Sequence, residues 1–377
     1  MLNRIQKKIR SFYLKYKNSK VIYNYYHTNF NKKVLISYLT DPLLKPSYKH
    51  ANNLEVKSIV SVFNCLEFNV DICDFRNKTF NIDRNYDVIF GFGYPLENSI
   101  LSKKGKTKNI LYATGAHPLY SIPASHKRLR QFYNKAAFFK PSLIREGGKE
   151  FLYQYSFSDY IILLGNEFTL NTYRLFTNVN INLVKGIVFK VNENINFNAK
   201  SKSNFLWFGG AGSVHKGLDL IIEAFTKLPN LNLYVCGNLD KDLINYYREK
   251  GGITKNILIL GFISINSQKF IDLMNKCAFV IKVSVTEAMC SSVLTCMVNG
   301  GLIPIISDSV GINVIKGSIS IKELNVEAVL NSIQRSQELT ASQIKYLAKE
   351  IMEYASNIYS VKNFKKSIKE ILINNEL

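Results

Sequence analysis

Short apolar runs alternate with amphipathic helical segments along this chain, and this alternation is the feature that most constrains its fold. In the first half, we expect strands at residues 34–38, 70–73, 87–90, 109–113 and 160–164. Residues 48–68, residues 125–139 and the segment after Asn166 have helical spacing. Strands rich in Val, Ile, Leu and Tyr that are separated by helices indicate an α/β fold with a parallel sheet.

The alternation restarts after a polar stretch, residues 191–204, whose Asn, Lys and Ser content suits a linker. Further strands are expected at 205–208, 231–236, 257–260, 278–283 and 302–305, with mostly helix from residue 321 onward. Because 377 residues exceed a typical single core, we predict two doubly wound Rossmann-like domains facing across a cleft. Their expected bounds are 1–195 and 196–360, and a last helix, 361–377, is expected to cross back to the first domain.

The apolar run at 204–208 leads into a glycine-rich loop that contains Gly209, Gly210 and Gly212 and ends with Lys216. A glycine loop before a helix lets a ligand approach unpaired N–H groups, and a lysine adds a mobile cation, so this segment suits a diphosphate. The alternative is an ordinary strand-to-helix turn with a solvated Lys216.

A second candidate segment follows the apolar strand at 278–283, where Glu287 is expected to open a helix of small and apolar residues. A carboxylate at a helix start is favoured by the helix dipole, so Glu287 could be a capping acid. The functional alternative is that Glu287 points into the cleft and accepts hydrogen bonds from the hydroxyls of a sugar.

These two segments, with two short turns between them, resemble the carboxyl-terminal domain of glycosyltransferase family 4, the glycosyl transferases group 1. The matching motifs are the glycine loop with Lys216 and Gly217, the turns 235–237 and 260–262, and Ser284 with Glu287 followed by the turn 301–304. The resemblance covers about residues 204–310. It implies a GT-B fold of two Rossmann-like domains, the second of which binds the donor.

The resemblance also implies an activity: retaining, metal-independent transfer of a hexosyl-type sugar from a nucleotide diphosphate sugar to a glycan or lipid-linked acceptor. No cofactor is expected.

The resemblance further implies roles for single residues. Lys216 would stabilise the leaving diphosphate, Glu287 would orient the sugar hydroxyls, and His117 would contact the sugar from the opposite wall. His117 lies in 113–118, which with 164–169 looks like a bacterial subgroup of the family, and its alternative is a turn histidine bonded to backbone. The expected donor-binding residues are Gly209, Gly210, Ala211, Gly212, Ser213, Lys216, Gly237, Phe262, Glu287, Ser291, Ser292, Val293 and Thr295.

The chain departs from the family pattern at three places. Ala211 stands where the family has an arginine, Thr295 stands where it has a second glutamate that binds the ribose, and residues 288–290 replace its Gly-Phe-Gly. These departures leave two alternatives open. One is a non-catalytic scaffold that binds a nucleotide sugar or a membrane, and the other is a sugar-nucleotide epimerase of the same architecture.

The net charge of +21 is concentrated in one half of the chain, because residues 1–200 hold 30 basic and 13 acidic side chains, a net +17. Residues 1–20 have seven cations, no acid and apolar residues at helical spacing, so a basic amphipathic helix is expected there. Contact with an anionic membrane is one interpretation, and packing of that helix on its own domain is the other. No nucleic-acid motif is present, so a nucleic-acid partner is not expected.

The remaining composition is that of an ordinary globular protein, with 47% hydrophobic and 20% charged residues. No apolar run is long enough to cross a bilayer, and no apolar signal segment follows the basic amino terminus. A cytoplasmic location is therefore expected, with peripheral association at the inner face of the cell membrane as the alternative. The six cysteines form no CxxC pair and are expected to be reduced.

Overall fold

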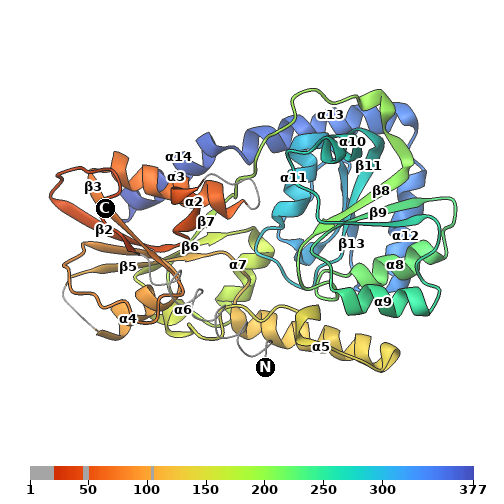
Figure 1. Cartoon of the computed structure of the whole chain (residues 1–377). Helices are drawn as coiled ribbons and strands as arrows, with labels where there is room; N and C mark the ends of the chain where they lie inside the picture. Colours follow the sequence, from red (N-terminus) through yellow and green to blue (C-terminus); the bar gives the residue numbers. More distant parts are fainter. Residues whose placement is uncertain (1–20, 46–50, 103–105) are drawn as a thin grey trace, which may run out of the picture.

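The computed structural model describes residues 21–45, 51–102 and 106–377. It consists of two α/β units, each built on its own sheet, that lie beside each other (Figure 1). The predicted basic helix at residues 1–20 lies outside the described residues and stays a prediction. The predicted fold class, two doubly wound sheets, is confirmed.

The first sheet has seven strands in the order β1-β3-β2-β4-β5-β6-β7, all parallel except the short edge strand β1. Its central strands are completely buried and rich in β-branched residues, as expected for a parallel sheet that is covered on both faces. The strands are β1 (Val21–Ile22), β2 (Lys32–Tyr38), β3 (Phe68–Asp74), β4 (Val88–Gly91), β5 (Lys108–Ala113), β6 (Tyr160–Leu164) and β7 (Ile181–Val184).

Helices follow most strands of the first sheet and cover its faces (Figure 1). Asn52–Cys65 begins later than predicted, and Pro118–Ala136 begins seven residues earlier than predicted, because Pro118 occupies the first helical position. The helical segments are α2 (Asp41–Leu44), α3 (Asn52–Cys65), α4 (Tyr94–Ser102), α5 (Pro118–Ala136), η1 (Pro141–Leu143), α6 (Tyr153–Phe157) and α7 (Glu167–Arg174).

The second sheet has six parallel strands in the order β10-β9-β8-β11-β12-β13. In chain order this is 3-2-1-4-5-6, so the direction of winding reverses between β8 and β11, where a doubly wound sheet binds its ligand. The strands are β8 (Ser201–Gly209), β9 (Asn232–Gly237), β10 (Ile257–Gly261), β11 (Cys277–Lys282), β12 (Ile303–Ser307) and β13 (Ile319–Ile321).

The helices of the second unit lie between and after its strands. They are η2 (Phe197–Ala199), α8 (Leu218–Thr226), α9 (Lys241–Glu249), α10 (Gln268–Lys276), α11 (Ser291–Gly300), η3 (Asp308–Val310), α12 (Val326–Gln337), α13 (Ala341–Ile358) and α14 (Val361–Asn374). Among the described residues, none of the helices combines the length and the apolarity that a membrane span requires.

Helix α14 returns to the first unit, which is the path proposed for the last segment of the chain (Figure 1). Its Lys365 donates to Ser61 Oγ of α3 at 2.9 Å, and the ring of Phe364 packs edge-on against Tyr112 of β5 at 6.4 Å between centroids. The carbonyl oxygens of Asn375 and Glu376 accept from Lys108 Nζ. The final helix therefore ties the second unit to the first.

Helix α5 makes the opposite crossing, because it belongs to the first unit by sequence and packs on α8 of the second (Figure 1). Arg128 of α5 forms an ion pair with Asp219 of α8, and both side chains are almost completely buried. About two helical turns further along α5, Lys135 pairs with Glu223 in an exposed position. Helix α5 thus contributes one buried and one exposed ion pair to the contact between the two units.

The buried pair should contribute far more to stability than the exposed one. Arg128→Met leaves the Asp219 carboxylate buried without its cation, so we expect the free energy of unfolding to fall by roughly 3–5 kcal/mol. Lys135→Met removes an exposed pair of the same two helices and should cost less than about 1 kcal/mol. Urea denaturation of both variants beside the parent protein checks this. Similar losses in the two variants would contradict it.

Candidate active site

Two neighbouring cavities lie at the carboxyl ends of the strands, between the two units. The first, about 340 Å³, lies against the ends of β8 and β9 and the start of α11, and the second, about 480 Å³, lies at the ends of β2, β3, β4 and β5. Each therefore occupies the position where its sheet is expected to bind a ligand. The residues that line both cavities are Asn52, Thr114, Arg145, Glu287 and Ala288.

The glycine loop forms one wall of the first cavity. Gly209, Gly210 and Lys216 line it, and Lys216 Nζ lies 3.9 Å from the position that a Cβ on Gly210 would take. Gly217, with φ +68°, comes just before α8, and any side chain there would collide with the carbonyl oxygen of Val283. The amides of residues 210–214 have no acceptor anywhere in the described parts of the chain. The loop therefore combines free N–H donors with one cation.

The segment 283–290 forms the facing wall, and it is bonded directly to the glycine loop. Val285 N donates to the carbonyl oxygen of His215 at 2.8 Å, and His215 Nε2 lies 2.7 Å from the carbonyl oxygen of Thr286. Glu287 N donates to the carbonyl oxygen of Ser309 at 2.8 Å. These contacts hold the segment as a loop, so Glu287 does not open a helix as predicted: α11 begins four residues later, at Ser291.

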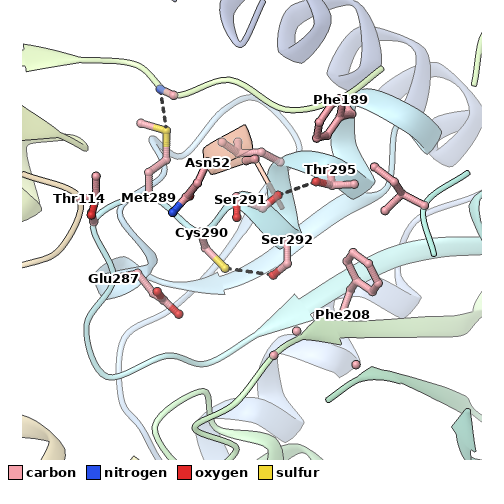
Figure 2. A pocket seen from close by; sticks show the side chains of 18 of the residues that line it. Asn52, Thr114, Phe189, Phe208, Glu287, Met289, Cys290, Ser291, Ser292 and Thr295 are labelled. Carbon is pink, nitrogen blue, oxygen red and sulfur yellow. Dashed lines mark hydrogen bonds between the residues drawn. The ribbon is translucent and has the colours of Figure 1, made fainter. Parts of the chain in front are cut away.

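The carboxylate of Glu287 reaches the boundary of both cavities (Figure 2). Ser284 Oγ donates to its Oε1 at 3.2 Å. Burial by itself would raise the pKa of Glu287, but the positive charges of Lys216, Arg145, His215 and Lys282 hold that pKa below its ordinary value. Glu287 is therefore an ionised hydrogen-bond acceptor among cations, which suits hydroxyl groups of a ligand.

His215 was not singled out from the sequence, although it lies within the glycine loop. Its Nδ1 lies 3.0 Å from Ser125 Oγ of α5 and its Nε2 bonds to the segment 283–290, so its ring connects three elements around the cavities. Burial lowers its pKa. Its position between the glycines and Lys216 was the sequence signal. Only Lys216 was considered there, because a phosphate site calls for a permanently charged cation.

Lys282, the last residue of β11, supplies a second and fully buried cation behind the glycine loop. Its ammonium donates to the carbonyl oxygen of Phe208 at 2.9 Å and lies 3.9 Å from the centre of the Trp207 ring. A side chain at Gly209 would collide with Lys282 Nζ, so these two residues are in immediate contact. Burial lowers the pKa of Lys282 to about 8.

The other predicted donor-site residues divide into two groups. Gly237 and Phe262 line the first cavity, as do Ser291, Ser292 and Thr295 (Figure 2). The side chain of Val293 is fully buried in the core, and Ala211, Gly212 and Ser213 are absent from the cavity wall. Thr295 Oγ1 donates to the carbonyl oxygen of Ser291 at 2.8 Å, which leaves its lone pairs available to a ligand.

The structure places His117 away from both cavities. It is the N-cap of α5, where Nδ1 accepts from Leu119 N at 3.3 Å. Its ring stacks on Phe176 at 4.8 Å, and burial lowers its pKa to about 4. This is the arrangement of a turn histidine bonded to backbone. Thr114, three residues earlier in the same segment, is the residue that lines the cavities.

Sequence reasoning missed most of the residues that the first unit contributes. Asn52, Glu55 and Arg145 come from α3 and from the segment after η1, and Gly186 and Phe189 come from the connection between the units. Glu55 Oε2 accepts from Tyr38 at 2.7 Å, and burial raises the pKa of this carboxyl to about 7. None of these residues belongs to a recognisable motif, so only the folded chain brings them together.

Comparison with known proteins relates the second unit of the chain to one family. Residues 190–333 match the model of the glycosyl transferases group 1. No curated protein matches the chain by sequence.

Solved structures share the fold at low sequence identity. Sucrose-phosphate synthase from Thermosynechococcus elongatus is 11% identical with a TM-score of 0.67, and the alignment covers 91% of this chain and 98% of that one. HepE from Anabaena in complex with UDP-glucose is 14% identical with a TM-score of 0.58, with 91% and 99% covered. TarM is 15% identical with a TM-score of 0.55, and the alignment covers 76% of this chain but spans only 54% of TarM.

The buried charge of Lys282 should cost stability, and the cost should depend on pH. Below pH 8 the side chain is charged in both the folded and the unfolded state. Between pH 8 and 10.5 only the unfolded state keeps the proton, so the stability of the parent protein rises with pH. We therefore expect Lys282→Met to be more stable than the parent at pH 7, by up to about 3 kcal/mol, and to lose this advantage toward pH 10.5.

Urea denaturation of both proteins from pH 7 to 10.5 measures this difference. Lys276→Met is the matched control, because Lys276 also lies over an aromatic ring, that of Tyr234, but is only half-buried. It measures what the loss of a lysine that is not fully buried does to stability over the same pH range. A difference between Lys282→Met and the parent that is constant across the range would refute the expectation.

Proposed function

We propose that the protein transfers a sugar from a nucleoside diphosphate sugar to an acceptor hydroxyl, starting from the match of residues 190–333 to the model of the glycosyl transferases group 1. The observation that carries the proposal is the meeting of three groups at the first cavity: the glycine loop, which reaches the wall through Gly209 and Gly210 and has free amides at 210–214, the Lys216 ammonium and the ionised Glu287 carboxylate. Donors and a cation suit a diphosphate, and a carboxylate suits the hydroxyls of a sugar.

The proposed donor extends across the first cavity. The diphosphate takes the amides of the glycine loop and Lys216, and the sugar lies at Glu287, where the two cavities meet. Thr295 accepts from the ribose, while Gly237 and the exposed ring of Phe262 border the base. UDP is a reasonable first probe, since the HepE structure of similar fold holds UDP-glucose.

The proposed chemistry is electrostatic. As the bond from the sugar to the diphosphate breaks, negative charge grows on the leaving group, where the amides, Lys216 and the buried Lys282 stabilise it. These groups supply charge stabilisation without a metal ion. The acceptor hydroxyl attacks on the face that the diphosphate leaves and gives its proton to the departing phosphate oxygen, so the configuration at the anomeric carbon is retained. Closure of the site between the two units excludes water and limits hydrolysis.

The second cavity is where we place the acceptor. Aromatic rings of Phe75, Phe92, Phe151 and Tyr155 and the amide of Gln154 line it, and Glu287 marks its border with the donor. Aromatic faces and an amide suit the ring and hydroxyls of an acceptor sugar. A glycan or lipid-linked oligosaccharide of bacterial surface polysaccharide assembly is the acceptor class we propose. We assign His117 no contact with either sugar.

Glu287→Gln tests the central role of the carboxylate. Neutralising it removes the strongest acceptor for sugar hydroxyls, so kcat/KM should fall at least a hundredfold, about 3 kcal/mol, while the variant stays folded at the assay temperature. The donor is selected first by thermal shift with a panel of nucleotide sugars, and radiolabelled transfer is then measured. Glu370→Gln, on the exposed face of α14, is the control and should transfer normally.

Near-normal turnover in Glu287→Gln would refute its role. The same assays separate the alternatives for the parent protein. Tight donor binding without transfer to any acceptor would favour a non-catalytic scaffold, and isomerised nucleotide sugar formed without acceptor would favour an epimerase.

The basic first half of the chain supports peripheral contact with an anionic membrane surface at the inner face of the cell membrane. Its net charge of +17 compares with +4 for residues 201–377, which hold 19 basic and 15 acidic side chains. Each well-placed cation contributes about 1 kcal/mol of surface attraction. Sedimentation with phosphatidylglycerol vesicles should show binding that falls steeply between about 50 and 300 mM salt. Equal binding to phosphatidylcholine vesicles would argue against this contact.

A further inference from the structure

The segment 140–152, which includes η1 and leads to α6, passes along the glycine loop of the other unit and is fixed there by its backbone. The carbonyl oxygen of Leu143 accepts from His215 N at 2.9 Å. Leu143 and Ile144 are both buried. Two side chains of the same segment, Lys140 and Ser142, bond to Asp242 and Asp240 beside α9. The next residue, Arg145, therefore starts from an anchored backbone.

The Arg145 side chain lies directly on the glycine loop. A Cβ added to Gly212 would be 2.9 Å from Arg145 Cγ and 3.4 Å from its Cδ, so the aliphatic stem covers that glycine. From there the side chain reaches the wall of both cavities. Gly212 is adjacent to Ala211, a position on the loop that carries no charge.

The guanidinium of Arg145 has no carboxylate partner among the described residues, unlike several other arginines of the chain. Arg76 is paired with Asp74, Arg128 with Asp219 and Arg174 with Glu167. Arg145 is exposed, and its charge acts on the groups of the cavity instead: it lowers the pKa of Glu287 and of His215. An unpaired guanidinium that is fixed beside free amides is suited to an oxyanion ligand.

We propose that Arg145 is a phosphate-binding residue of the donor site, which the first unit supplies across the cleft to the distal phosphate of the nucleoside diphosphate. Its place where the two cavities meet selects the distal phosphate, next to the transferred sugar, over the phosphate nearer the ribose. Arg145 thereby provides the cation that the loop lacks at Ala211. This inference rests on the proposed function, because it assumes that the first cavity holds the donor.

Isothermal titration of the full chain with UDP and UMP tests the assignment, with ADP, AMP, GDP and GMP as further pairs if UDP does not bind. Arg145→Ala should weaken the diphosphate about tenfold to a hundredfold and the monophosphate less than twofold. Arg145→Lys keeps the charge without the planar fork and should fall between Arg145→Ala and the parent. An exposed side chain should not affect the fold, so the melting temperatures should agree.

One negative and one positive control accompany the Arg145 variants. Lys149→Ala removes a cation four residues further along the same segment that lines neither cavity, and it should stay within twofold of the parent. Lys216→Ala should weaken the diphosphate, since it removes the cation of the loop itself.

Each remaining outcome overturns the inference. Unchanged diphosphate affinity in Arg145→Ala, with normal binding by the parent, refutes the role of Arg145 and leaves the proposed function standing. Equal weakening of the diphosphate and the monophosphate assigns Arg145 to another part of the nucleotide. If the parent binds none of the three diphosphates, the proposed function fails, and this inference fails with it.

Discussion

The site depends on the adjacency of β8 and β11. These strands are far apart in sequence but hydrogen-bonded in the sheet, so the loops that follow them meet at one edge. The backbone bond from Val285 to His215 then fixes one loop to the other. Lys216 and Glu287 face the same cavity because of this constraint, and the opposite charges need no direct contact to be kept in place. A ligand can therefore enter between them.

The half of the candidate site that the second unit forms could be predicted from sequence because its residues lie in short local motifs. A glycine run after an apolar strand and a carboxylate after the next central strand are visible without a structure. The structure differs from the prediction at two residues. Val293 turned inward because every residue of 293–300 in α11 is buried, and Glu287 lies in a loop because its neighbours bond to His215 and Ser309, contacts that no local pattern encodes.

The first unit was predictable in its strands but not in its contribution to the site. Strand positions follow from apolar runs, whereas Asn52 and Arg145 reach the cavity only through the packing of elements that are distant in sequence. The segment 113–118 contains one feature that could be predicted from sequence and one that could not. Its position at a strand end correctly indicated the cleft, but Pro118 at the first helical position makes His117 an N-cap, which turns that ring away. The proline was the sequence signal that α5 begins directly after His117.

The dry pair between Arg128 and Asp219 has a mechanical consequence. Moving the units apart at α5 would bring two ions from an enclosed contact into solvent and break the neighbouring contact of Ser125 with His215. Displacement is easier where the two walls of the cleft meet without such bonds. The two units should therefore rotate relative to each other about α5 rather than separate there. A ligand should then enter and leave at the rim of the cleft farthest from that helix.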